Sequence, residues 1–179
     1  MKRRVVCSFL LGVVMVLGSF QARAADNQFS GPLKEQWDRI RNMVVKSAEA
    51  VPEDKYDFKP TPEVRSFRDQ FVHIIGENFR MMGMASGDNQ KPPENLKTRA
   101  EIVKALNDSY DFGAKVLGGM TDAKAVENVA GFGGRQVPRW TLALMNIVDN
   151  MDHYGNLVVY MRLNGIVPPS TAARPPQGR

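Results

Sequence analysis

The chain has 179 residues, of which 43% are hydrophobic and 24% are charged, and it carries a formal net charge of +5 and one Cys. This composition excludes a disordered or fibrous protein, and the length is that of about one domain of ~100–200 residues. A chain of this size can bury a core without disulfides or a structural metal, and a single Cys cannot form an internal disulfide.

Residues 1–24 have the three sections of a secretory signal peptide. The basic run Lys2-Arg3-Arg4 is followed by an apolar run from Val5 to Phe20, and then by the small-residue site Ala22-Arg23-Ala24. The alternative is a retained membrane anchor, but the run of about 16 residues is shorter than the roughly 20 that span a bilayer. We therefore predict cleavage after Ala24 and a periplasmic or secreted protein with no stable membrane anchor.

Removal of this segment changes the charge and the cysteine content. Residues 1–24 hold four basic residues and no acid, so the remaining chain keeps about +1 of the formal +5. The basic pI of the full chain comes mostly from the signal and does not indicate nucleic-acid binding, and we predict none. Cys7 leaves with the signal, which excludes disulfides, thiolate metal sites and cysteine nucleophiles from the mature protein.

Four segments of the mature chain have the apolar periodicity of amphipathic helices. Their stripes run over residues 33–51, 67–82, 102–116 and 140–161. Ser30 is the expected cap of the first helix. Capping boxes are predicted for the second, where Ser66 precedes Asp69, and for the third, where Thr98 precedes Glu101.

The connections predict how the helices are joined. Residues 52–65 and 119–138 leave room for crossovers, the polar segment 88–93 is typical of a turn, and no alternating strand is recognisable. The glycine-rich residues 131–135 predict a flexible turn, because they lack the ending of a phosphate-binding loop. The fold class is therefore all-α, a four-helix bundle over 25–169 with antiparallel neighbours, followed by a disordered tail at 170–179.

Two histidines are present, and their positions suggest a metal site. His73 lies midway along the second helix and His153 midway along the fourth, four residues after Asp149. Residues four apart on a helix share one face, with Cβ atoms ~5–6 Å apart. If the second and fourth helices face each other, His73 is a third ligand. Glu77, one turn after His73, is the predicted general base or the residue that orients a ligand.

This ligand set would suit Zn²⁺, Ni²⁺, Fe²⁺ or Mn²⁺ and leave positions open for water or substrate. The alternative is a solvated pair, because Asp149 and His153 fall nearly opposite the stripe from Trp140 to Met161. Apolar residues also share that sector, so the fourth helix is covered on two sides. One side is expected to be the core, and the other a polar pocket or a homodimer contact.

Two stretches of the sequence resemble a known family. The residues 67–74, FRDQFVHI, and 149–169, DNMDHYGNLVVYMRLNGIVPP, are similar to the DinB-like (YfiT-like) four-helix bundle proteins over roughly residues 30–170. The resemblance implies a divalent metal held by three histidines, one on the second helix and two spaced four apart on the last long helix. His73 and His153 match two of these positions, and Asp149 stands at the third.

Three functions remain open from the sequence. The first is a metal-dependent hydrolase or transferase acting on a small-molecule substrate, in which His73, Asp149 and His153 hold the metal. The second is a non-catalytic periplasmic module that binds a metal or a small ligand. The third is a bundle whose site has degenerated and whose surface serves dimerisation. The resemblance adds that related members include thiol-dependent transferases and isomerases.

Overall fold

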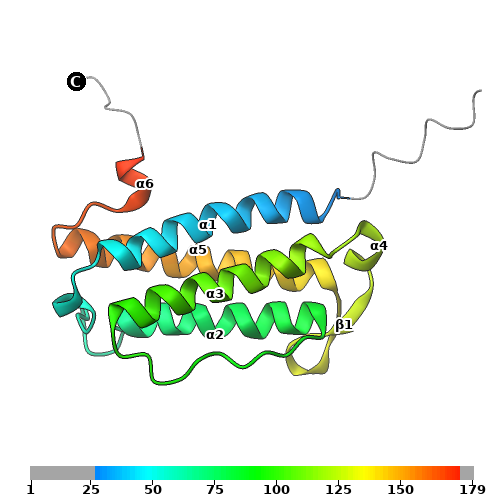
Figure 1. The fold of residues 1–179 in the computed structure, drawn as a ribbon, viewed down its shortest axis with the longest axis horizontal. Coiled ribbons are helices and arrows are strands. Elements are labelled where there is room, and N and C mark those ends of the chain that lie inside the picture. Colours follow the sequence, from blue (N-terminus) through cyan, green and yellow to red (C-terminus); the bar gives the residue numbers. More distant parts are fainter. Residues whose placement is uncertain (1–26, 174–179) are drawn as a thin grey trace, which may run out of the picture.

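A computed structural model describes residues 27–173 (Figure 1). The predicted signal peptide, its cleavage site and the last six residues of the predicted tail lie outside this range. The helices are α1 (Ser30–Ala50), α2 (Phe67–Ser86), α3 (Arg99–Gly118), α4 (Asp122–Ala125), α5 (Arg139–Leu163) and α6 (Pro169–Ala172), with short 3₁₀ turns η1 (Glu53–Lys55) and η2 (Phe132–Gly134) and strands β1 (Asn128–Ala130) and β2 (Gln136–Pro138).

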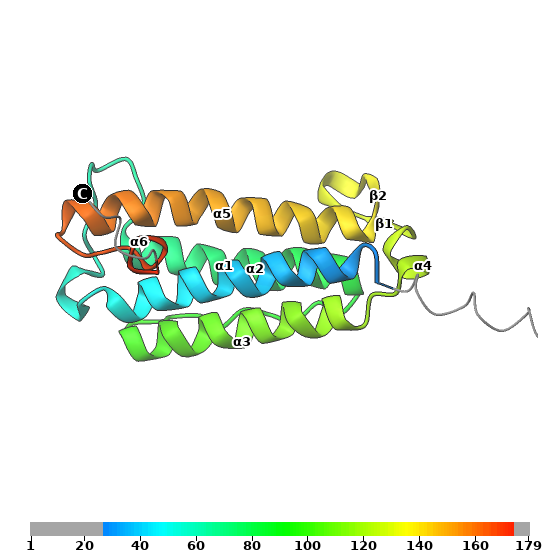
Figure 2. The same cartoon turned by 90° about the horizontal axis from the view of Figure 1, so that it is seen from above.

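The four long helices form a bundle, as the sequence predicts (Figures 1 and 2). Around its axis the order is α1, α3, α2, α5, and each helix packs against the next in this ring. Seen from above, α1 lies over α2, while α3 and α5 lie on opposite sides (Figure 2). The second and fourth predicted helices, α2 and α5, are therefore neighbours.

The connection between α2 and α3 differs from the expected turn. Residues 87–98 run in an irregular, exposed path back along the whole bundle, so α2 and α3 point in the same direction (Figure 1). Pro92 and Pro93 explain this path, because proline disfavours helix at its own position and at the residue before it. The prediction of antiparallel neighbours is thus wrong for α2 and α3.

Both predicted capping boxes are present. The Ser66 hydroxyl accepts a hydrogen bond from Asp69 N at 3.1 Å, and the Thr98 hydroxyl accepts one from Glu101 N at 3.2 Å. Ser30, however, is the first residue of α1 and does not cap it. No side chain caps α1, but just before it the carboxylate of Asp122 accepts hydrogen bonds from Gln28 N and Phe29 N, each at 3.1 Å.

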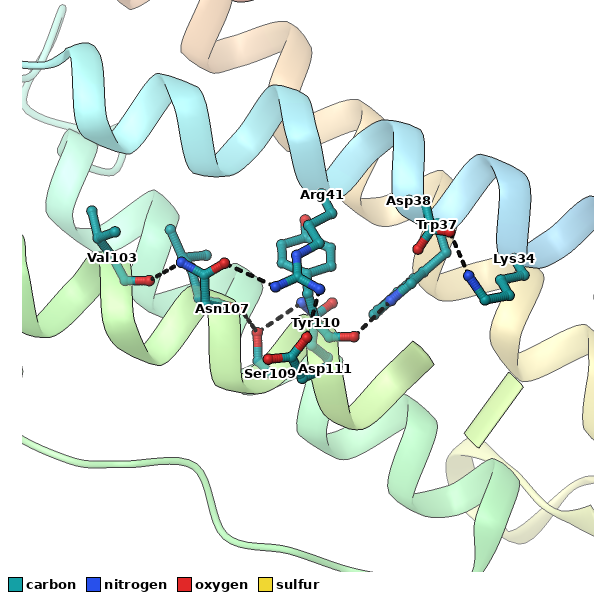
Figure 3. A network of polar contacts seen from close by, with 11 residues as sticks. Lys34, Trp37, Asp38, Arg41, Val103, Asn107, Ser109, Tyr110 and Asp111 are labelled. Carbon is teal, nitrogen blue, oxygen red and sulfur yellow. Dashed lines mark hydrogen bonds and ion pairs between the residues drawn. The ribbon is translucent and has the colours of Figure 1, made fainter. Parts of the chain in front are cut away.

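The seam between α1 and α3 is closely packed around Trp37. The fully buried Trp37 donates from Nε1 to the carbonyl oxygen of Tyr110 at 2.9 Å, and a Cβ atom at Gly113 would lie 2.2 Å from the Trp37 ring. Arg41 closes the outer edge of the seam through Asn107 and Asp111 (Figure 3). Gly113 is therefore the residue that lets the indole sit between the two helices.

The link from α3 to α5 contains a hairpin that is not predicted from the sequence. Strands β1 and β2 pair antiparallel, with Val129 opposite Val137, and residues 131–135 form the turn between them. Strands of three residues are too short to show a recognisable alternation. The expectation that residues 131–135 form a turn is confirmed.

The chain beyond α5 is more ordered than predicted. Residues 169–172 form the helix α6, and the backbone N–H of Ser170 donates to the hydroxyl of Tyr154 at 3.0 Å. The prediction of disorder is therefore wrong for residues 170–172. Within residues 27–173, no helix combines the length and the apolar content needed to span a bilayer.

Candidate metal centre

The bundle brings the three predicted ligands together. His73 comes from α2, Asp149 and His153 come from α5, and one ligand atom from each lies within 4.8 Å of the others. The two imidazole rings meet edge to face, with centroids 4.5 Å apart and planes at 77°. Donor atoms this close to one another can share one cation with metal–ligand bonds of about 2.0–2.2 Å.

His153 is oriented by Gln70, one turn before His73 on α2. The Oε1 atom of Gln70 lies 2.8 Å from Nδ1 of His153, and both side chains are buried. Since an amide oxygen only accepts, Nδ1 carries the proton in this bond. A neutral imidazole then presents the lone pair of Nε2 toward Asp149 and His73, the orientation that a metal ligand requires. Gln70 was not predicted from the sequence, although it lies three residues before His73, on the same side of the helix.

Asp149 has two carboxylate oxygens in different surroundings. Oδ1 lies 3.5 Å from Nε2 of His153, whereas Oδ2 is buried and has no hydrogen-bond partner among the described residues. The adjoining His153 imidazole, and after it His73 and Arg65, hold the pKa of Asp149 below its ordinary value, against the opposing effect of burial. Asp149 is therefore a carboxylate with a buried, unpaired oxygen, a group that a cation would satisfy.

His73 lies at the more accessible side of this group. It is half-buried, and its pKa is lowered, first by burial and then by the positive charge of Arg65, so the neutral imidazole is favoured. A neutral imidazole is the form that binds a metal. The side chain of Asp149 is 29% exposed and that of His153 only 7%. The three donors thus form a site that is closed at His153 and partly exposed at His73 and Asp149.

Glu77 is not among the clustered donors. Its Oε1 atom accepts a hydrogen bond from Nη1 of Arg80 at 3.3 Å, and its side chain is 15% exposed. Its negative charge acts on His73, where it opposes the lowering of the pKa. The role of Glu77 as a base or an orienting residue stays a prediction.

The structure shows which of the two faces of α5 is buried in the bundle. His153 is 6% exposed, whereas Met151, part of the predicted core stripe, is 45% exposed. The alternative in which Asp149 and His153 form a solvated pair is therefore wrong for His153. The core side of α5 carries polar residues that the periodicity treats as solvent-facing.

Buried amides adjoin the candidate metal ligands, and they were not predicted as a group from the sequence. Asn150, next to Asp149, donates from Nδ2 to Oδ1 of Asn78 at 2.8 Å, and Asn78 donates to the hydroxyl of Ser109 at 3.0 Å. Asn146, Asn150, Asn78 and Ser109 are all fully buried. Asn78 at a position of an apolar stripe was the signal in the sequence that could have revealed them.

Comparisons with known proteins agree with this fold. The family model of the DinB superfamily matches residues 36–157. A DinB-like protein from Bacillus subtilis is 22% identical, with a TM-score of 0.64, over 75% of this chain and 92% of its own. One from Bacillus cereus is 16% identical, with a TM-score of 0.66, over 78% and 95%.

A mycothiol-dependent maleylpyruvate isomerase is also similar in structure, with 13% identity and a TM-score of 0.50, over 72% of this chain and 60% of its own. These identities show a shared fold. None of the curated proteins matches the chain. Because the family model covers most of the bundle, including all three clustered donors, the chain belongs to the DinB superfamily.

Proposed function

We propose that this protein binds one divalent transition metal through His73, Asp149 and His153, and that it is an exported metal-dependent hydrolase or transferase. The observation that carries the proposal is the convergence of three ligand atoms within 4.8 Å, from two helices far apart in the chain. Oδ2 of Asp149, which is buried and has no hydrogen-bond partner within residues 27–173, supports it, since a buried carboxylate oxygen without a partner is costly unless a cation or a donor satisfies it.

The donor set fits the metals that the sequence suggests. Two imidazole nitrogens and one carboxylate oxygen suit Zn²⁺, Ni²⁺, Fe²⁺ or Mn²⁺, and three protein ligands leave at least one position for water or substrate. A metal bound there would act as a Lewis acid or lower the pKa of a water molecule. Gln70 fixes the tautomer of His153, and the half-buried His73 leaves the approach to the site open.

The first experiment measures metal content. The protein is purified without chelator or a metal-binding tag and compared by elemental analysis with the Asp149→Ala, His153→Ala double variant. We expect about one equivalent of metal in the parent and none in the variant. Asp152→Ala is the matched control, because it removes an exposed acid of the same helix that lies outside the ligand group.

Two outcomes would contradict metal binding. One is the absence of metal in the parent, even after incubation with Zn²⁺, Ni²⁺ and Mn²⁺. The other is the same metal content in the parent and in a double variant whose circular dichroism remains helical. Bound metal without turnover across hydrolase and transferase substrates would instead leave a non-catalytic metal-binding module.

Export is a separate part of the proposal. It is supported by the order of basic, apolar and small residues over 1–24. When the full chain is produced in a bacterium, we expect the periplasmic fraction to contain a protein whose N-terminal residue is Ala25. Retention of residues 1–24 in the membrane fraction would contradict cleavage and favour an anchor.

A further inference from the structure

Four buried side-chain atoms around the candidate metal centre have no hydrogen-bond partner in the part of the chain that the structure describes. They are the Tyr110 hydroxyl, Nδ2 of Asn146, Oδ1 of Asn150 and Oδ2 of Asp149. Three of them belong to residues 146–150 of α5, little more than one helical turn. A buried polar group that makes no hydrogen bond is destabilising, so this group of atoms needs an explanation.

The backbone fixes the direction in which the buried amides point. The carbonyl oxygen of Leu106 can only accept, and the Ser109 hydroxyl donates to it at 2.8 Å, so Ser109 in turn accepts from Nδ2 of Asn78 at 3.0 Å. Oδ1 of Asn78 then accepts from Nδ2 of Asn150 at 2.8 Å, and the same Nδ2 lies 3.4 Å from Oδ1 of Asn146. Turning any one of these amides would bring two donors or two acceptors together. The direction of this chain therefore leaves Nδ2 of Asn146 and Oδ1 of Asn150 without partners.

Tyr110 is held beside this chain of amides. Its ring packs against that of Trp37, with centroids 5.0 Å apart, and its carbonyl oxygen accepts from the indole (Figure 3). Burial, and less strongly the carboxylate of Asp149, raise the pKa of the Tyr110 hydroxyl, while the Asn78 amide lowers it. The hydroxyl is therefore near both groups, although it makes a hydrogen bond to neither.

We propose that one internal water molecule lies between these four atoms and joins Tyr110 to Asp149. Two of the groups can donate, the Tyr110 hydroxyl and Nδ2 of Asn146, and two atoms only accept, Oδ1 of Asn150 and Oδ2 of Asp149. A water molecule accepts two hydrogen bonds and donates two, and buried waters typically make about three to groups that would otherwise be unsatisfied. A cation at this point would face the N–H groups of Asn146, so water fits the set better.

Tyr110 is thereby a positioning residue for the candidate metal ligand Asp149. The water ties this carboxylate to α3, just as Gln70 ties His153 to α2. Each carboxylate oxygen has two lone pairs, so Oδ2 can accept from the water and still contribute to a metal site. The positioning role rests on the proposed metal binding, whereas the water itself does not.

Tyr110→Phe tests both parts, with Zn²⁺ alone as the probe. Competition with a chromogenic chelator measures the zinc affinity, which we expect to fall about tenfold, the lower end of the usual effect of losing a partner of a metal ligand. The melting temperature of the metal-free protein should fall by about 2–4 °C, because the water loses a hydrogen bond.

Tyr56→Phe is the matched control. Its hydroxyl is equally buried, but it donates to the carbonyl oxygen of Ala48 at 2.7 Å. The control should lower the melting temperature and keep the zinc affinity of the parent. A role of Tyr110 in packing alone would make the two variants alike.

A second variant tests whether the two donors share one water. Asn146→Leu keeps nearly the shape of the side chain but has no polar atom, and alone it should also weaken zinc binding. In the double variant with Tyr110→Phe, the fold loss of affinity should be smaller than the product of the two single losses, because both groups act through the same water.

The outcomes separate the water, the positioning role and the proposed function. A Tyr110→Phe variant that melts at or above the temperature of the parent would overturn the water, since a hydroxyl without a partner is lost at no cost. An unchanged zinc affinity, or losses that multiply in the double variant, would overturn the positioning role through a shared water. A parent that binds no Zn²⁺ would contradict the proposed function and the positioning role together, while the melting temperatures would still test the water.

Discussion

The amide oxygen of Gln70 lies 2.8 Å from Nδ1 of His153, and this bond joins α2 to α5 within the candidate metal centre. Gln70 lies on α2, the helix that also carries His73, and it fixes the ring of His153, a candidate ligand on α5. The orientation of the site is therefore built into the packing of two helices rather than into the ligands alone.

Replacement of Gln70 by Leu is expected to weaken metal binding by about 10–100-fold, the usual effect of losing the partner that orients a ligand. The affinity for Zn²⁺ can be measured by competition with a chromogenic chelator. Gln70→Glu keeps an acceptor oxygen and should retain most of the affinity. Equal losses in the two variants would mean that Gln70 contributes only to packing.

The pKa of His73 predicts how stability depends on pH. Burial and Arg65 lower this pKa, so below ~6.5, the ordinary value, the unfolded chain binds more protons at this residue than the folded chain. The free energy of unfolding of the metal-free protein should therefore decrease as the pH falls below ~6.5 and toward the pKa of the folded state.

Urea unfolding in the presence of a chelator, at several pH values, measures how steeply the free energy of unfolding changes with pH. His73→Asn should flatten this dependence, because the variant has no group at this position that titrates in the range. A second loss is expected in more acidic solution, since the lowered pKa of Asp149 adds stability that is present above ~3.9 and disappears as the pH falls through the folded value. Identical slopes for the parent and His73→Asn would refute the assignment.

Gly113→Ala should destabilise the bundle by about 1–3 kcal/mol, because the added methyl group overlaps the Trp37 ring and forces α1 and α3 apart. The matched control is Gly76→Ala on α2, where a Cβ atom meets nothing within 4 Å. The control should gain up to ~1 kcal/mol from helix propensity alone. Urea midpoints give both values. An increase in stability in both variants would show that α1 and α3 can shift to accept the added methyl group.

Asn150→Ala should cost about 1–3 kcal/mol, since it leaves Oδ1 of the buried Asn78 without its donor. Combined with Asn78→Ala, the losses should be less than additive, because the two amides share one hydrogen bond. The exposed Asn42 offers a control, whose change to Ala should stay within ~0.5 kcal/mol. If the loss of stability in the double variant equals the sum of the two single losses, the two amides act independently.

The features that were predictable from the sequence are local or repeated along a helix. The capping boxes at Ser66 and Thr98 depend on residues three apart, and the pair Asp149 and His153 on the geometry of one turn. The hydrogen bonds that hold the chain just before α1 were not predictable, because their acceptor, Asp122, lies more than 90 residues away. Nor was the core face of α5, since apolar residues occupy two opposite sides and periodicity alone does not say which side is covered.

The order of helices around the bundle determines how the molecule can fold. The helices α1 and α2, which precede the segment 87–98, are diagonal to each other, and so are α3 and α5, which follow it (Figure 2). The four main packing interfaces therefore all join one half of the chain to the other half. The long helices of one half do not pack mainly against each other, so we expect unfolding to be a single cooperative transition.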